Sequence, residues 1–128
     1  LGCGMAFGQV SKTLHQTFFL DGAEKVNINV VAKNIRMEET KGTRILVETK
    51  VTISLPNARL LDFVCNSRRY DLAAPVDATT KELTISSKKS NDVIIVKGEE
   101  CIETLEYVIY MPTNVKFSNN STIVNSDE

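Results

Sequence analysis

The strongest constraint on the fold is the regular alternation of side chains along two stretches of the sequence. In residues 101–111, every second position except Glu103 carries an apolar or aromatic side chain, namely Cys101, Leu105, Tyr107, Ile109 and Met111. Residues 45–53 repeat the pattern with Ile45, Val47, Thr49, Val51 and Ile53. A period of two is typical of a β-strand with one buried and one wet face. These stretches therefore predict a mainly β fold, in which 101–111 is a central strand that ends at Pro112.

Shorter alternating segments predict further strands over 12–20, 24–37, 83–88 and 93–96. The apolar parity of the second segment shifts at Val31-Ala32, which predicts a bulge or bend between two short strands. Turns are expected at Asp21-Gly22, at the polar segment 38–42, and at 97–100, where a hairpin would lead from 93–96 into the strand of 101–111.

One segment has helical spacing instead. Within residues 57–67, the apolar side chains Leu60, Leu61, Val64 and Cys65 are spaced three or four residues apart across successive turns, after a candidate N-cap at Asn57. The sequence therefore predicts one short helix. The alternative is a wide loop with a single helical turn, because a helix this short depends on tertiary packing.

Size and composition indicate one soluble globular domain. The chain has 128 residues, of which 42% are hydrophobic and 24% charged, close to the globular average. Its 15 Lys and Arg residues against 16 Asp and Glu residues give no net positive field to attract nucleic acid. We expect the domain to span residues 9–118 and to be followed by a polar tail, 119–128, that is disordered or pairs with a partner.

The first eight residues resemble the end of a secretory signal. Ala6 and Gly8 occupy the two small-residue positions of a cleavage site, so cleavage is expected before Gln9. Two alternatives are a lipoprotein anchored through Cys3 and an ordinary cytosolic N-terminus. Both the signal and the lipoprotein interpretations predict an exported protein of the periplasm, the outer-membrane surface or the extracellular space. Only in the lipoprotein alternative would it contact a membrane, through a lipid on Cys3.

If Cys3 is removed with the signal, two cysteines remain, Cys65 and Cys101. An oxidising compartment would allow a disulfide between them. The alternative is two free thiols that pack as small hydrophobic side chains.

The sequence offers no catalytic, cofactor-binding or metal-binding set. His15 is the only histidine, no C-x-x-C pair occurs, and the glycine-rich phosphate-binding, nucleophile-elbow and zinc-protease motifs are missing from the sequence. We therefore predict a protein that is not an enzyme and uses no cofactor, although a site built only from carboxylates would escape this reasoning.

Two speculative sites involve the predicted helix. Glu103 shares the parity of the apolar residues of its strand, so it needs a partner such as Arg68 or Arg69 if it is buried. The two arginines are alternatively a small anion site, or simply a charge pair at a helix end. A small-ligand or glycan pocket between sheet and helix would be lined by four aromatic residues: Phe18, Phe63, Tyr70 and Tyr107.

Several strand phrases, taken together, resemble a known group of proteins. These phrases are Leu-His-Gln-Thr-Phe at 14–18, Ile-Leu-Val-Glu-Thr-Lys-Val at 45–51, Arg-Tyr-Asp-Leu at 69–72, Leu-Thr-Ile-Ser-Ser-Lys at 83–88 and Glu-Tyr-Val-Ile-Tyr-Met-Pro at 106–112. They resemble secreted bacterial envelope proteins of the adhesin-like, head-GIN type. The resemblance implies an exported β-rich fold, often a right-handed β-solenoid or rolled sheet, with no known enzymatic activity.

The chain departs from that group in its shortness, its 6 glycines and its lack of a fixed internal period. A compact β-sandwich or roll with one helix is therefore as consistent with the sequence as a short solenoid. The predicted function is a non-enzymatic, adhesin-like interaction or structural domain. It would act through a sheet face or edge, either on a protein partner or by self-association through strand edges. The alternative is the small-ligand or glycan-binding domain.

Overall fold

The computed structural model describes residues 9–54, 57–87 and 93–124. Their elements are β1 (Val10–Phe19), β2 (Lys25–Asn29), β3 (Val31–Ala32), β4 (Asn34–Thr40), β5 (Arg44–Ile53), α1 (Ala58–Asn66), β6 (Leu72–Ala73), β7 (Val76–Asp77), β8 (Glu82–Ser87), β9 (Ile95–Val96), β10 (Glu99–Glu100), β11 (Glu103–Pro112), β12 (Lys116–Asn119) and β13 (Thr122–Ile123). The predicted fold class, mainly β with one short helix, is confirmed.

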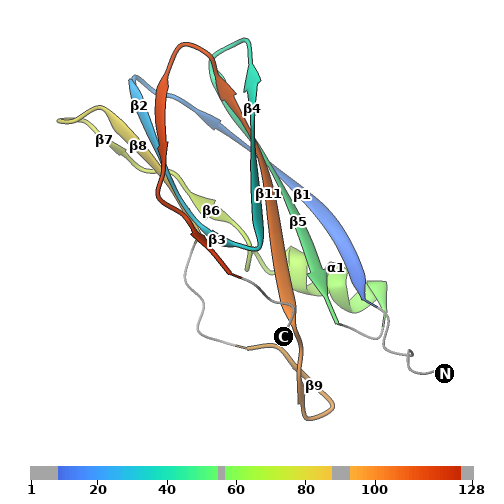
Figure 1. Cartoon of the computed structure of the whole chain (residues 1–128). Helices are drawn as coiled ribbons and strands as arrows, with labels where there is room; N and C mark the ends of the chain where they lie inside the picture. Colours follow the sequence, from blue (N-terminus) through green and yellow to red (C-terminus); the bar gives the residue numbers. More distant parts are fainter. Residues whose placement is uncertain (1–8, 55–56, 88–92, 125–128) are drawn as a thin grey trace.

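The longest strands form a four-stranded sheet in the order β1-β5-β11-β4 (Figure 1). β11 is an inner strand, as expected, and it runs antiparallel to β5 and parallel to β4. β4 and β5 follow each other in the sequence, yet β11 lies between them. The turn predicted over 38–42 begins later than expected, because β4 continues through Thr40 along β11.

A second sheet, in the order β12-β2-β8-β6 with β7 also on β8, packs against the first. The alternating apolar side chains of both sheets meet in one core. The largest fully buried members of this core are Val26, Ile28, Val30, Ile45, Val47, Leu83, Ile85, Tyr107 and Ile109. Burial of these side chains is the main stabilising contribution to the fold.

Residues 25–40, which we call the β2–β3–β4 coil, carry the chain from the second sheet into the first. Along the coil Val26, Ile28, Val30 and Ala32 are all buried, and the inward parity then changes to Ile35 and Met37. The predicted bend is present, but at Lys33 rather than at Val31-Ala32. The chain must change parity there because β4 belongs to a different sheet from β2.

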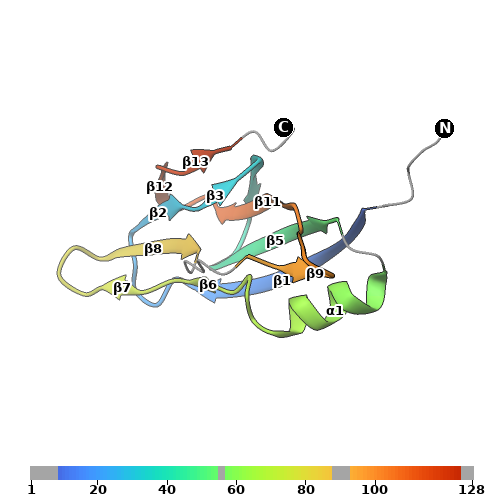
Figure 2. The same ribbon diagram turned by 90° about the horizontal axis from the view of Figure 1, so that it is seen from below.

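β12 and β13 lie along the outside of this coil. β12 pairs in parallel with β2 and β13 in parallel with β3, so residues 116–123 lie along residues 25–32 at constant register. Figure 2 shows both strands on the side of the molecule opposite α1. We predicted residues 119–128 as a tail that is disordered or pairs with a partner. In the structure, the backbone of residues 119–124 instead hydrogen-bonds to residues 28–32 of the same chain.

The helix has the predicted start and buried face. The side chain of Asn57 accepts a hydrogen bond from the Leu60 N–H at 2.9 Å, which caps α1. Leu61 and Cys65 face a second apolar cluster that includes Val51 and Ile53 of β5. α1 therefore covers one end of the inner sheet face, beside β1 (Figure 2).

Two predicted turns are built from pairs of residues with positive φ. Asp21 and Gly22 have φ of 54° and 85°, and Lys97 and Gly98 have φ of 53° and 82°, a region in which glycine meets little steric cost. The second turn joins β9 to β10 in a small hairpin of its own. The predicted hairpin from 93–96 into the central strand is thus present over its first residues, where the Cys101 N–H also donates to the Ile94 carbonyl at 2.8 Å. It does not continue along β11, which pairs with β5 and β4 instead.

Some predictions concern residues that lie outside the described ranges. These are the signal segment 1–8, including the lipidation alternative at Cys3, and the last four residues of the predicted tail. Among the described residues, no helix is long and apolar enough to span a membrane.

Candidate functional site

The described residues contain no group of three His, Cys, Asp or Glu side chains arranged to hold a metal ion. His15 lies on the outer face of β1, where its Nε2 is 3.8 Å from a carboxylate oxygen of Glu48, and its side chain is 70% exposed. A candidate site must therefore be sought among buried polar groups and surfaces.

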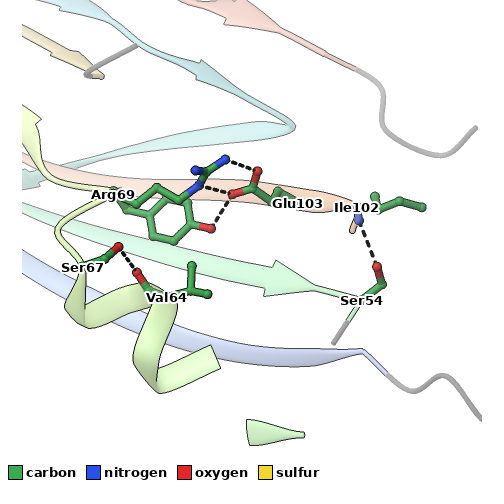
Figure 3. Close-up of polar contacts among 7 residues, drawn as sticks. Ser54, Val64, Ser67, Arg69, Ile102 and Glu103 are labelled. Carbon is green, nitrogen blue, oxygen red and sulfur yellow. Dashed lines mark hydrogen bonds and ion pairs between the residues drawn. The ribbon is translucent and has the colours of Figure 1, made fainter. Parts of the chain in front are cut away.

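The clearest half-buried charged group is an ion pair between Arg69, which follows α1, and Glu103 of β11 (Figure 3). Arg69, just after the helix, donates through Nε and Nη2 to the two carboxylate oxygens of Glu103 at 2.8 and 2.7 Å. The Tyr70 hydroxyl donates to the same carboxylate. The two charged side chains are only 17% and 23% exposed. The expectation that a buried Glu103 would need one of these arginines is confirmed.

The surroundings of this ion pair raise the pKa values of two side chains, Tyr70 and Arg69. Burial first, and then the hydrogen bond to Glu103, raise the pKa of Tyr70 far above its ordinary value. The hydrogen bond to Glu103 also raises the pKa of Arg69. Since the carboxylate already accepts three hydrogen bonds within the chain, its chemistry is structural: it joins the end of α1 to the central strand.

The predicted anion site at Arg68 and Arg69 is not formed. The Arg69 guanidinium is committed to Glu103, while Arg68, whose side chain is 84% exposed, lies 3.7 Å from a carboxylate oxygen of Asp71. Each arginine thus has a carboxylate of its own chain beside it, so the two charges do not converge on a common anion.

The predicted aromatic pocket is also wrong. Phe63 points outward from α1 and is 74% exposed, whereas Tyr70 is buried in the cluster under the helix. Tyr107 is buried in the other cluster, between the sheets, where burial raises its pKa to about 12. Phe18 lines a separate hollow of about 470 Å³ at the end of β1, together with Ala74 and Val76. Phe18 and Tyr107 thus face the main core, Tyr70 faces the cluster under the helix and Phe63 faces water, so the four rings do not line one pocket.

The predicted disulfide is not present, because Cys65 and Cys101 are free cysteines. Both pack in the cluster beneath α1, Cys65 buried and Cys101 half-buried. Burial raises the pKa of both thiols. They therefore match the alternative expectation of two free thiols that pack as small hydrophobic side chains.

The middle of the outer face of the four-stranded sheet is polar, although Phe19 and Leu46 are exposed toward one end. A shallow hollow of about 240 Å³ lies over Val108 there. Its rim carries two basic and two acidic side chains, which are Arg36, Lys50, Glu48 and Glu106. These charges balance, so the hollow selects neither an anion nor a cation.

A more distinctive surface lies along β12 and β13, which pair with β2 and β3 on one side only. We call this surface the open end and define it by the free edge of β4 together with Phe117 and Ile123. In the parallel register, Phe117 stands beside Val26 and Ile123 beside Ala32. Val26 and Ala32 are each 1% exposed, so Phe117 and Ile123 occupy inward, core-facing positions.

These two inward side chains are nevertheless in water. Phe117 is 48% exposed and Ile123 59% exposed. Polar contacts hold their strands in place, since the Asn27 side chain accepts from Ser118 and Asn120 at 3.3 and 2.6 Å and the Val30 N–H donates to Ser121 at 3.0 Å. The open end is therefore a surface on which two apolar side chains at core-facing positions are only partly covered by the described residues.

Sequence reasoning missed this surface because it assigned residues 119–128 to a tail. A weak signal was available, because Lys25-Val26 and Lys116-Phe117 begin two stretches that place an apolar residue again six positions later, at Ala32 and Ile123. Two such matches are too few to distinguish a second segment that lies along residues 25–32 from a chance similarity.

Comparison with known proteins gives no family. The chain matches no family model and no curated protein. Among solved structures it is similar to a "putative cell adhesion protein" from Clostridium sporogenes ATCC 15579, with a TM-score of 0.49 and 16% identity over 88% of this chain and 47% of that one. This chain thus spans about half the length of that protein. The head-GIN resemblance stays a prediction.

Proposed function

We propose that this chain is a non-enzymatic, adhesin-like interaction domain of a bacterial cell envelope, exported from the cytoplasm, that binds a protein through its open end. The observation that carries the proposal is the half-exposed state of Phe117 and Ile123 at core-facing positions. Apolar side chains in such positions are normally covered by the next repeat of a stack or by a cap.

Strand edges support the same proposal. β4 pairs only with β11, and β12 only with β2, so both strands present one unpaired side among the described residues. An unpaired edge beside exposed apolar side chains is a template for another strand. The partner would contribute both hydrogen bonds to the edges and apolar area over Phe117 and Ile123.

The export component rests on the signal-like residues 1–8. It is tested by fractionating the bacterium that makes the protein and by treating intact cells with a protease that cannot enter them. We expect the protein outside the cytoplasm, with its N-terminus at Gln9. Full-length protein confined to the cytosol, with residues 1–8 intact, would contradict the proposal.

The interaction component is tested with three variants of the purified domain: Phe117→Asp, Ile123→Asp and the control Phe63→Asp. All three add a charge to an exposed apolar side chain, but Phe63 lies on α1, away from the open end. Binding to cells or isolated envelopes of the same bacterium is measured by a labelled-protein assay.

We expect the two open-end variants to lose at least about tenfold in binding, because one buried unpaired charge costs more than about 1.4 kcal/mol. The control should bind as the original protein does. Thermal unfolding of each variant shows that its fold is kept. Equal binding by all four proteins would refute the open end as the interaction surface.

A further inference from the structure

We propose that the partner of the open end is an extended segment of another protein, added as a strand parallel to β4. The segment would place apolar residues at two alternate positions and a basic residue at the next alternate position. This inference rests on the proposed function and specifies the chemistry of the partner at the same surface.

The direction of the added strand follows from the ladder that leads to β4. The Asn120, Thr122 and Val124 N–H groups donate in turn to the carbonyls of Ile28, Val30 and Ala32, at 2.7 to 2.9 Å. This parallel ladder therefore reaches Ala32, two residues before β4 begins at Asn34. Along β4 itself, the side that continues the ladder has no strand among the described residues. A strand in the same direction would continue this ladder along β4, beyond the bend at Lys33.

The apolar positions follow from the side chains that β4 turns inward. Ile35 and Met37 are partly buried against the main core. On the β11 side they lie beside Tyr107 and Ile109, which are 2% and 0% exposed. A strand on the other side of β4 would contact the same two side chains, so apolar residues at these two registers would bury them.

The basic position follows from the next inward residue, Glu39. It lies beside Met111, which is buried, yet Glu39 itself is exposed at the edge of the sheet. Within the described ranges no ion pair involves Glu39, whereas the neighbouring Glu38 is 2.9 Å from the Arg36 Nε. An inward carboxylate at an edge discourages an apolar neighbour. A lysine or arginine at this register would instead neutralise it.

The proposal is tested with fluorescein-labelled eight-residue peptides and the full chain, by fluorescence anisotropy. The first peptide, Thr-Val-Thr-Ile-Thr-Lys-Thr-Ser, places Val, Ile and Lys beside Ile35, Met37 and Glu39 when it adds in parallel. The second replaces its Lys by Glu. The third replaces its Val and Ile by Ser. The fourth has the first sequence reversed and would match β4 only in the antiparallel direction.

We expect the Lys peptide to bind about fivefold more tightly than the Glu peptide, as one exposed ion pair provides. The peptide without Val and Ile should bind about tenfold more weakly, because it loses the apolar contacts. In the Glu39→Lys variant the preference should invert, so that the Glu peptide becomes the tighter ligand. Glu99→Lys, which makes the same change of charge in the β9–β10 hairpin, should leave the preference as it was.

Equal affinities for the first two peptides, or the same preference in Glu39→Lys, would overturn the proposal. So would tighter binding of the reversed peptide than of the first peptide, since that would mean antiparallel addition. Binding that appears only in a chain ending at Val124 would mean that the protein's own last residues occupy the edge, which also refutes a partner segment. If these tests fail while Phe117→Asp still abolishes envelope binding, the open end remains the interface and only strand addition along β4 is wrong.

Discussion

Removal of the Glu103 carboxylate should be among the more destabilising single changes in this chain. Three hydrogen bonds converge on it, and the Glu103 and Arg69 side chains are 23% and 17% exposed. Breaking a fully buried ion pair costs about 3–5 kcal/mol, because the remaining charge is left without a partner. The residual exposure lowers this, so we expect Glu103→Ala to reduce the free energy of unfolding by about 3 kcal/mol. For a chain of 128 residues, this lowers Tm by about 10 °C.

The assay is a double-mutant cycle with Arg69→Ala, measured by urea unfolding. The double variant should lose less than the sum of the single losses, by about 2 kcal/mol, because the second change removes a charge that has already lost its partner. Asp62→Ala is the matched control: it breaks the ion pair to Lys12, whose side chains are 56% and 37% exposed, and should cost less than about 1 kcal/mol. A coupling energy under about 0.5 kcal/mol would refute the argument that the pair joins α1 to β11.

Two further predictions concern single groups. The pKa of Tyr107 is raised from 10.0 to about 12, so the folded state keeps a proton that the unfolded state loses. The contribution of Tyr107 to stability is therefore unaffected below about pH 10 and falls by about 2–3 kcal/mol up to about pH 12, beside a separate fall from Tyr70. Urea unfolding of Tyr107→Phe should show a weaker total fall, and an unchanged fall would contradict this. Because Cys65 and Cys101 are free, unreduced, unfolded full-length protein should give 3 reactive thiols, Cys3 included; a count of one would indicate the disulfide.

Local periodicity was sufficient for the longest strands and the helix, but not for the short strands β6, β7, β12 and β13. Alternation in 45–53 and 101–111 predicted β5 and β11, and the Asn57 cap with the spacing of Leu61 and Cys65 predicted α1. The same parity placed Glu103 on the buried face, and the cost of an unpaired buried charge then required a nearby arginine. These inferences succeed because the face on which a side chain lies depends only on its position within one element.

The arrangement of the elements required the tertiary structure. Parallel and antiparallel strands have the same alternation, so the sequence did not show that β11 separates β4 from β5, or that β12 and β13 follow the β2–β3–β4 coil. The predicted aromatic pocket failed for this reason, since Tyr70 and Tyr107 are buried in different clusters.

The sequence by itself thus determined the strand-rich class, the single helix and the need of Glu103 for a cationic partner. Only the tertiary structure decided which strands are neighbours, and with them the open end at Phe117 and Ile123. The physical reason is that strand pairing joins residues about ninety positions apart in the sequence through backbone groups that every residue carries. The pairing therefore leaves little trace in the identity of the side chains.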